Sequence, residues 1–180
     1  LGAAGAEEVD PMEVALAATV AVLHMSTGQN EIVLGIPRLP LRLGLDPAAS
    51  FLTLVRTVRD RVREARAHGD VPLEALLGML ELPEDPTRAP LAQARFTWGE
   101  STSPGGSTDL PPDLAFRFAP AGDAVRLSVD FAAGLYAPGT AEDLLHHVEA
   151  LLVRARARVE SRRDYEGALA DVERILELDP

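Results

Sequence analysis

The sequence predicts an α/β (α+β) fold in which about five strands and about five helices are mixed along the chain. Three observations support this fold class. Apolar residues recur at helical spacing in some segments and alternate with polar residues in others. Glycine, proline, asparagine and aspartate separate these segments. The chain has 180 residues, of which 47% are hydrophobic and 25% charged, so it can bury a sizeable core.

Residues 11–26 are predicted to form a buried helix. Alanines fill most of the positions between three apolar residues at helical spacing: Leu16, Val20 and Leu23. Gly28 follows as the expected C-cap, because glycine adopts the left-handed conformation that ends many helices.

Two strands are predicted next, at residues 31–36 and 39–45. Both are short apolar runs bounded by turn residues. Only Pro37 and Arg38 separate them, and this connection looks too short. The junction of Pro37, Arg38 and Leu39 is therefore the most informative feature of the chain.

A helix is predicted to begin at Asp46 and Pro47, because a capping acceptor precedes a proline whose φ already suits a helix. Its core side is a stripe of apolar residues: Phe51, Val55, Val58, Val62 and Ala65. Several arginines lie largely off this stripe and are expected to be solvated: Arg56, Arg59, Arg63 and Arg66. They also suggest an anion site, but the interleaved Asp60 and Glu64 favour plain solvation.

A further helix is predicted to begin at Asp70 and Pro72 and to end before Pro83 and Pro86, because proline disfavours a helical residue before it. Alternating residues then predict a strand at 92–98.

The second half of the chain begins with a predicted loop at 99–113, which is rich in Gly, Ser, Thr and Pro. Strands are predicted at 114–119 and 124–132, joined by a turn at Gly122 and Asp123. The second strand is expected to bury one face and to expose the other, and its apolar residues alternate: Val125, Leu127, Val129 and Phe131.

A long helix is predicted at 140–160, starting at Thr140 with Asp143 three residues later in a capping-box pattern. Its predicted core side consists of Leu145, Val148, Leu152, Ala155 and Val159. An amphipathic helix at 164–178 is predicted to end the chain.

The composition excludes several kinds of chemistry. Cysteine is absent, which excludes thiol catalysis, disulfides and cysteine-ligated metals. All 17 basic residues are arginine, so no Schiff-base or phosphate-loop lysine exists. The net charge of −11 argues against nucleic acid and anionic membranes as partners. We expect no cofactor, no metal site and a cytoplasmic location.

Four segments match one protein family in order and in spacing. They are Thr27–Gln29 with the strand after it, His68–Glu74, Glu84–Leu91, and Leu127–Tyr136 with the helix that carries His147. Together they resemble the C-terminal lobe of a condensation domain from nonribosomal peptide synthetases. The resemblance implies one lobe of the chloramphenicol-acetyltransferase-like fold, a mixed sheet with helices packed on it.

The second and third segments carry the motif residues of that family. The resemblance implies structural or interface roles for His68, Asp70, Pro72, Glu74, Asp85, Arg88, Pro90 and Leu91. The chain departs from the motifs at Gly69, Leu73 and Thr87, where the family has glutamine, phenylalanine and serine.

Two further features of the family are missing. Its His-His-x-x-x-Asp-Gly signature belongs to the other lobe. His146 and His147 do not reproduce it, because no Asp-Gly follows and neighbouring helical side chains point about 100° apart. The family also carries a tunnel-floor insertion where this chain has Pro37, Arg38 and Leu39, so this junction is interpreted as a shortened floor loop. No catalytic residue with family support remains.

The leading interpretation is a truncated, non-catalytic condensation-like domain at residues 1–160, acting as a structural or protein-interaction module in nonribosomal peptide biosynthesis. Expected partners are an adjacent adenylation or carrier-protein domain or a recruited tailoring enzyme. Loss of the other lobe is expected to expose an apolar surface, which suggests a homodimer.

Two alternatives stay open. The chain is an excised lobe of an active condensation enzyme if the parent sequence carries the histidine signature upstream. Residues 161–180, predicted as a docking helix, also resemble half of a tetratricopeptide repeat, and further repeats downstream would indicate a scaffold.

Overall fold

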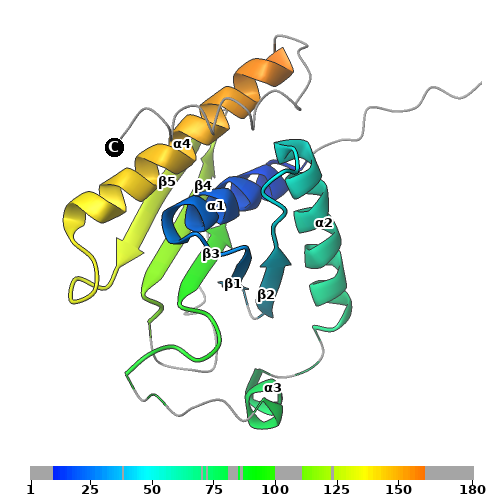
Figure 1. The fold of residues 1–180 in the computed structure, drawn as a ribbon, viewed down its shortest axis with the longest axis vertical. Helices are drawn as coiled ribbons and strands as arrows, with labels where there is room; N and C mark the ends of the chain where they lie inside the picture. The colour runs from blue at the N-terminus through cyan, green and yellow to red at the C-terminus, as the bar shows by residue number, and fades with distance from the viewer. Residues whose placement is uncertain are drawn as a thin grey trace, which may run out of the picture.

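The computed structural model describes residues 10–37, 39–69, 71, 73–80, 85, 87–99, 111–122 and 124–160 (Figure 1). The described helices are α1 (Pro11–Thr27), α2 (Phe51–Ala67), α3 (Leu73–Met79) and α4 (Pro138–Glu160). The strands are β1 (Glu31–Ile36), β2 (Leu39–Gly44), β3 (Ala94–Trp98), β4 (Leu114–Ala121) and β5 (Ala124–Phe131). The predicted docking helix beyond residue 160 lies outside the described residues, as do Arg38, Asp70, Pro72, Pro83, Pro86 and Asp123.

The strands form one mixed five-stranded sheet in the order β2-β1-β3-β4-β5. The central pairs, β1 with β3 and β3 with β4, are parallel. The outer pairs, β1 with β2 and β4 with β5, are antiparallel hairpins. The predicted mixed sheet is therefore confirmed, and both of its edges are short hairpin strands.

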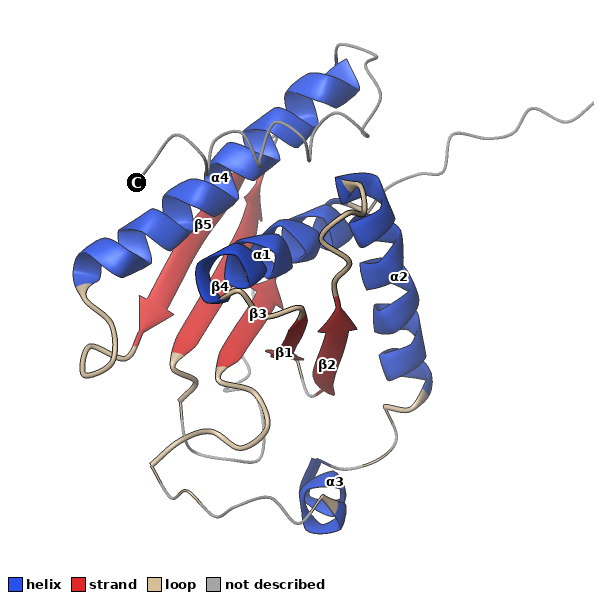
Figure 2. Cartoon of the chain, in the orientation of Figure 1, coloured by secondary structure: helices blue, strands red, loops and turns tan. Residues whose placement is uncertain are grey.

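Three helices cover one face of this sheet (Figure 2). α1 lies over the centre, while α4 packs beside β5 and α2 packs beside β2. One cluster of buried side chains joins these helices to the inward residues of all the central strands. Its largest aromatic members are fully buried: Phe51, Phe96, Phe116 and Phe118. α3 lies apart, at the end of a long excursion from the helical layer.

α1 shows why its sequence forms a buried helix. Asp10 caps the N-terminus by accepting a hydrogen bond from the Met12 amide at 2.9 Å, and Pro11 occupies the first turn. Gly28 ends the helix in the left-handed conformation with φ of 69°, as predicted. The helix lies between α2, α4 and the sheet, so nearly its whole central part is buried.

β1 and β2 are joined through Pro37 and Arg38, and Arg38 lies outside the described residues. Pairing continues to Ile36 opposite Leu39, directly beside the turn. The short connection therefore does not prevent β1 and β2 from pairing along their whole lengths. The interpretation of this junction as a shortened floor loop stays a prediction.

Two predicted helix starts were wrong. Asp46 forms a turn in which its carboxylate accepts from the Ala48 amide at 3.0 Å, and α2 begins only at Phe51 after its N-cap Ser50. α4 begins at Pro138, so Thr140 lies inside its first turn.

Burial differs from the predicted patterns at three places. Arg59 is buried and 6% exposed, although the pattern predicted a solvated side chain. α4 buries Leu144 and Leu151, whereas the predicted core residues Leu145 and Leu152 are only half-buried. In β5 the inward residues are half-exposed because this strand is an edge, and Val125 is 44% exposed. No described helix is long and apolar enough to cross a membrane.

Candidate functional site

The family-motif segment His68–Glu74 begins at the end of α2. His68 is the exposed C-cap of that helix, and its amide donates to the Ala65 carbonyl at 3.3 Å. Glu74 lies in α3, but its side chain is outside the described part, as are Asp70 and Pro72. The structure therefore places only His68 of this segment in detail, as a helix-ending residue.

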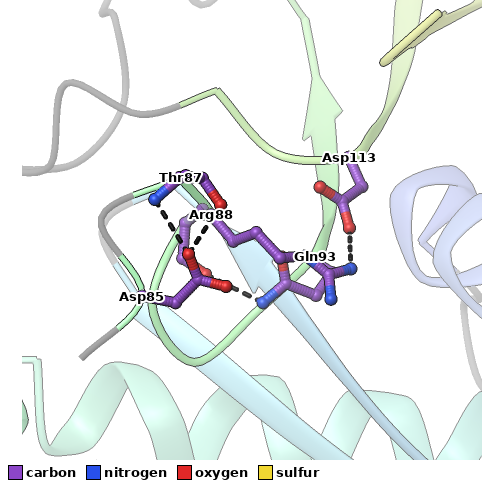
Figure 3. A network of polar contacts seen from close by, with 6 residues as sticks. Asp85, Thr87, Arg88, Gln93 and Asp113 are labelled. Atoms are coloured by element: carbon purple, nitrogen blue, oxygen red, sulfur yellow. Dashed lines mark hydrogen bonds and ion pairs between the residues drawn. The ribbon is translucent and has the colours of Figure 1, made fainter. Parts of the chain in front are cut away.

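Residues of the family-motif segment Glu84–Leu91 form the polar network of Figure 3. The Asp85 carboxylate accepts from the Thr87 amide at 2.9 Å and from the Thr87 hydroxyl at 2.6 Å. The Arg88 guanidinium donates to Asp113, whose side chain is only 6% exposed. Arg88 thus joins the segment before β3 to the segment before β4.

The same network controls the charge of its members. The hydroxyl of Thr87 is the main cause that holds the pKa of Asp85 below its ordinary value, and the Thr87 amide and the charge of Arg88 act in the same direction. The hydrogen bond to Asp113 raises the pKa of Arg88. Asp85 and Arg88 are therefore both held in their charged forms, and Arg88 forms an ion pair with Asp113, which favours a structural role over proton transfer.

A backbone turn completes this segment. The Ala92 amide donates to the Pro90 carbonyl at 2.8 Å, which closes a γ-turn around Leu91. Leu91 has φ of 65°, in the left-handed region that a leucine rarely adopts. Gln93 follows, its carbonyl accepts from the Leu114 amide at 3.1 Å, and β3 and β4 then run in parallel. The motif therefore aligns the starts of two central strands.

Gln93 also carries the one buried side-chain oxygen found without a hydrogen-bond partner in the described part of the chain. Its amide nitrogen donates to the Ala89 carbonyl at 2.9 Å (Figure 3). Sequence reasoning missed both Gln93 and Asp113, because each is an isolated polar residue beside a strand and its partner comes from another segment.

The four histidines lie on different surfaces. His24 donates a hydrogen bond through Nδ1 to the Gln29 carbonyl at 2.7 Å, near the end of α1. His146 is exposed on α4, while its neighbour His147 is half-buried. Groups of three or more potential metal ligands are absent among the described residues.

We call the side of the sheet that faces away from α1, α2 and α4 the open face. Alternation and strand register place one arginine of each of four strands on it: Arg42, Arg95, Arg117 and Arg126. Two carboxylates share this face, Glu31 paired with Arg42 and Asp130 paired with Arg117. The open face thus presents charged residues, while the predicted apolar inter-lobe surface stays a prediction. The exposed large apolar residues of the described segments are Val71, Met79, Leu80, Val125, Leu135 and Val153.

Comparisons with known proteins agree with this fold. A scan of protein-family models gives no match. An N-(5-amino-5-carboxypentanoyl)-L-cysteinyl-D-valine synthase of Amycolatopsis lactamdurans is 30% identical over an alignment of 152 residues, and the match covers 68% of this chain and 4% of the relative. Surfactin synthase subunit 1 of Bacillus subtilis (strain 168) is 28% identical over an alignment of 175 residues, and the match covers 80% of this chain and 5% of the relative.

Among solved structures, the X-domain in the "Complex of the X-domain and OxyB from Teicoplanin Biosynthesis" matches with a TM-score of 0.65 and 26% identity. The match covers 77% of this chain and 38% of that chain. This chain belongs to the condensation-domain family of nonribosomal peptide synthetases.

The condensation-domain assignment fits the observed geometry of the motif segments. The predicted family and the predicted mixed sheet are both confirmed, and the chain resembles a condensation-domain module of nonribosomal peptide synthetases. The chain spans less than half of the matched structure and a small fraction of the curated relatives. Within this condensation-domain lobe, Asp85, Arg88, Pro90 and Leu91 all lie in the turn that precedes β3.

Proposed function

We propose that this condensation-like lobe is non-catalytic by itself and serves as a structural and protein-interaction module in nonribosomal peptide biosynthesis. The observation that supports this proposal is that described motif residues form hydrogen bonds and an ion pair within the lobe. Arg88 is engaged with Asp113, and Asp85 is engaged with Thr87, so both hold the backbone before β3. These groups stabilise the lobe and offer no free base near an open reaction site.

The histidines support the same proposal. A general base must lie within hydrogen-bond reach of the proton that it removes. His146 and His147 are neighbours on a helix that packs on the covered face of the sheet, and no Asp-Gly follows them in the sequence. Their placement suits surface and packing roles.

The proposed partners are an adjacent adenylation or carrier-protein domain, or a tailoring enzyme recruited to the assembly line. The X-domain relative was solved in a complex with OxyB, which supports a protein-binding role for a lobe of this family. The shortened loop at Pro37, Arg38 and Leu39 is part of this proposal, because a tight hairpin has no segment that could line a substrate tunnel.

The test combines binding with activity. The purified chain is titrated against each neighbouring domain of its assembly line by calorimetry, and carrier-bound acyl and aminoacyl substrates are assayed for peptide product by mass spectrometry. We expect binding to one neighbour and no product. Peptide product that disappears in His147→Ala would overturn the proposal, and so would the failure of every neighbour to bind.

One observation favours a second candidate function. The chain covers only 38% of the X-domain chain that it matches, so a catalytic histidine on a separate N-terminal lobe is compatible with the comparison. This candidate is an excised lobe of an active condensation domain. Product formation that requires an added N-terminal lobe, and that is insensitive to His146→Ala and His147→Ala, would favour it.

A further inference from the structure

The open face has a charge of the opposite sign to that of the chain. Its strand residues include four arginines against the carboxylates of Glu31 and Asp130, an excess of two positive charges. The whole chain has a net charge of −11. A local reversal of this kind sets the electrostatic potential that an approaching partner meets.

Arg95 lies at the centre of this face. Its cross-strand neighbours are Gly35 in β1 and Ala115 in β4, and neither can form an ion pair. A Cβ placed on Gly35 would lie 3.9 Å from Cγ of Arg95, so the aliphatic part of the arginine runs over this glycine. Among the described residues, no carboxylate is paired with Arg95, which leaves a half-buried guanidinium without a counter-ion there.

The surroundings of Arg95 disfavour its charged form. Burial is the larger cause that holds the pKa of its guanidinium below the ordinary value, and the charge of Arg117 acts in the same direction. A negative group placed between these two arginines would offset both effects. Such a site therefore favours an anion more than an isolated surface arginine does.

The two ion pairs on the open face show that its arginines bind carboxylates. Arg42 donates through Nε to one oxygen of Glu31 at 2.7 Å and through a terminal nitrogen to the other at 2.8 Å. Arg117 donates through Nε to Asp130 at 2.6 Å. Bidentate pairing of this kind gives both strength and orientation to an arginine–carboxylate contact.

We infer that the open face, centred on Arg95 and Arg117, docks a carboxylate-rich surface of a partner protein domain. This inference rests on the proposed interaction function and adds the docking surface and the chemistry of its partner. Small side chains lie between the arginines, namely Gly35, Thr97, Ala115, Ala119 and Ser128, so the face suits a broad protein surface. Small ligands prefer concave sites.

Two other occupants fit the charges less well. A symmetric pair of copies joined through their open faces would bring the arginines of one copy against those of the other, which is unfavourable. A nucleic acid would meet a chain whose total charge is strongly negative. An acidic protein surface avoids the first penalty, and it meets less of the second because it carries negative charge less densely than a phosphate backbone.

The test uses a fluorescein-labelled, glutamate-rich helical peptide and fluorescence anisotropy. Arg95→Gln/Arg117→Gln removes two charges from the open face. The control Arg61→Gln/Arg66→Gln removes two charges from α2, and Arg61 matches Arg117 because each has a carboxylate partner and a side chain that is 53% exposed. We expect the first variant to weaken peptide binding about tenfold and the control to change it less than about twofold.

Salt and competitors complete the test. Raising the ionic strength from about 50 mM to about 0.5 M should abolish most of the binding, because exposed charges are screened. Equal affinities of both double variants would overturn the inference, as would the absence of peptide binding. Equal competition by inorganic phosphate or single-stranded DNA would replace it with a general anion site.

The two proposals fail in different ways. If no neighbouring synthetase domain binds, the proposed function is contradicted while the peptide result stands. If a neighbouring domain binds the native chain and Arg95→Gln/Arg117→Gln equally well, only the docking surface is contradicted.

Discussion

The ion pair between Glu13 and Arg59 offers a direct test of how α1 and α2 are held together. Arg59 Nε donates to Glu13 Oε2 at 2.7 Å, and the two side chains are 7% and 11% exposed. Glu13→Gln keeps the shape of the side chain but removes its charge, so Arg59 stays buried with less compensation. Removing one member of a buried pair costs about 3–5 kcal/mol. We expect about 3 kcal/mol, since Arg59 makes a further interaction.

The assay is urea unfolding followed by fluorescence. Trp98, the only tryptophan of the chain, lies in β3 and packs against Phe118, so its emission reports on the sheet. Glu64→Gln is the matched control, because Glu64 and Arg61 are also 2.7 Å apart but are 57% and 53% exposed. This exposed pair should contribute no more than about 0.5 kcal/mol. In a thermal scan, the expected loss of about 3 kcal/mol of stability in Glu13→Gln corresponds to a fall in Tm of about 6–12 °C.

A double variant separates charge from packing. Glu13→Leu/Arg59→Met removes both charges and keeps apolar volume, so it should regain most of the lost stability. The reasoning is refuted if Glu13→Gln and Glu64→Gln lose equal stability. A double variant as unstable as Glu13→Gln would show that shape, and not an uncompensated charge, is what matters at this contact.

Three further predictions test the backbone turns and the motif network. Gly28→Ala should cost about 1 kcal/mol in urea unfolding, because φ is 69° and no atom lies within 4 Å of a Cβ placed there, which leaves only backbone strain. Leu91→Gly should be about 1 kcal/mol more stable than Leu91→Ala, because both lose the side chain and only glycine relieves φ of 65°. Thr87→Val should raise the pKa of Asp85 toward its ordinary value of 3.8, measured by NMR titration. Because the pKa of Asp85 is lowered in the folded chain, this carboxylate stabilises the native state above pH 3.8, and the effect is lost as the pH falls through the folded pKa. The free energy of unfolding of Thr87→Val should therefore change less with pH in this range.

The strands could be predicted well from the sequence because their signals are local. Alternation of apolar and polar residues located β3, β4 and β5 to within about two residues. α1 was also found nearly to its ends, since Gly28 marks its C-terminus in the sequence as well as in space. Patterns of this kind depend only on neighbours along the chain.

Helix starts and buried charges depend on distant residues, and there the predictions failed. Arg59 lies largely off the apolar stripe of α2, so the stripe alone predicted a solvated side chain. Its burial requires Glu13, 46 residues earlier, on a helix whose packing angle no local pattern reveals. The competing caps Asp46 and Ser50 likewise offer similar side-chain acceptors, and only the packing of Phe51 decides between them.

The motif residues also show that local signals could be predicted from the sequence and contacts between distant segments could not. The resemblance identified Arg88 as a structural residue, but its partner Asp113 lies beyond a long loop and carries no motif of its own. The arginines of the open face were visible in the sequence one at a time. Their common side became apparent only through the register of β1, β3 and β4, which aligns Arg95 with Gly35 and Ala115.

The β1–β2 hairpin links the shortened junction to the open face. Pairing is continuous from Glu31 opposite Gly44 to Ile36 opposite Leu39, so the sheet edge is complete without an inserted segment. A two-residue loop is too short to fold back over either face of its hairpin. Arg42 is accordingly left 72% exposed at this edge, on the same face of the sheet as the half-buried Arg95. On our proposal, the short junction that removes a tunnel floor also keeps the arginines accessible to an acidic partner.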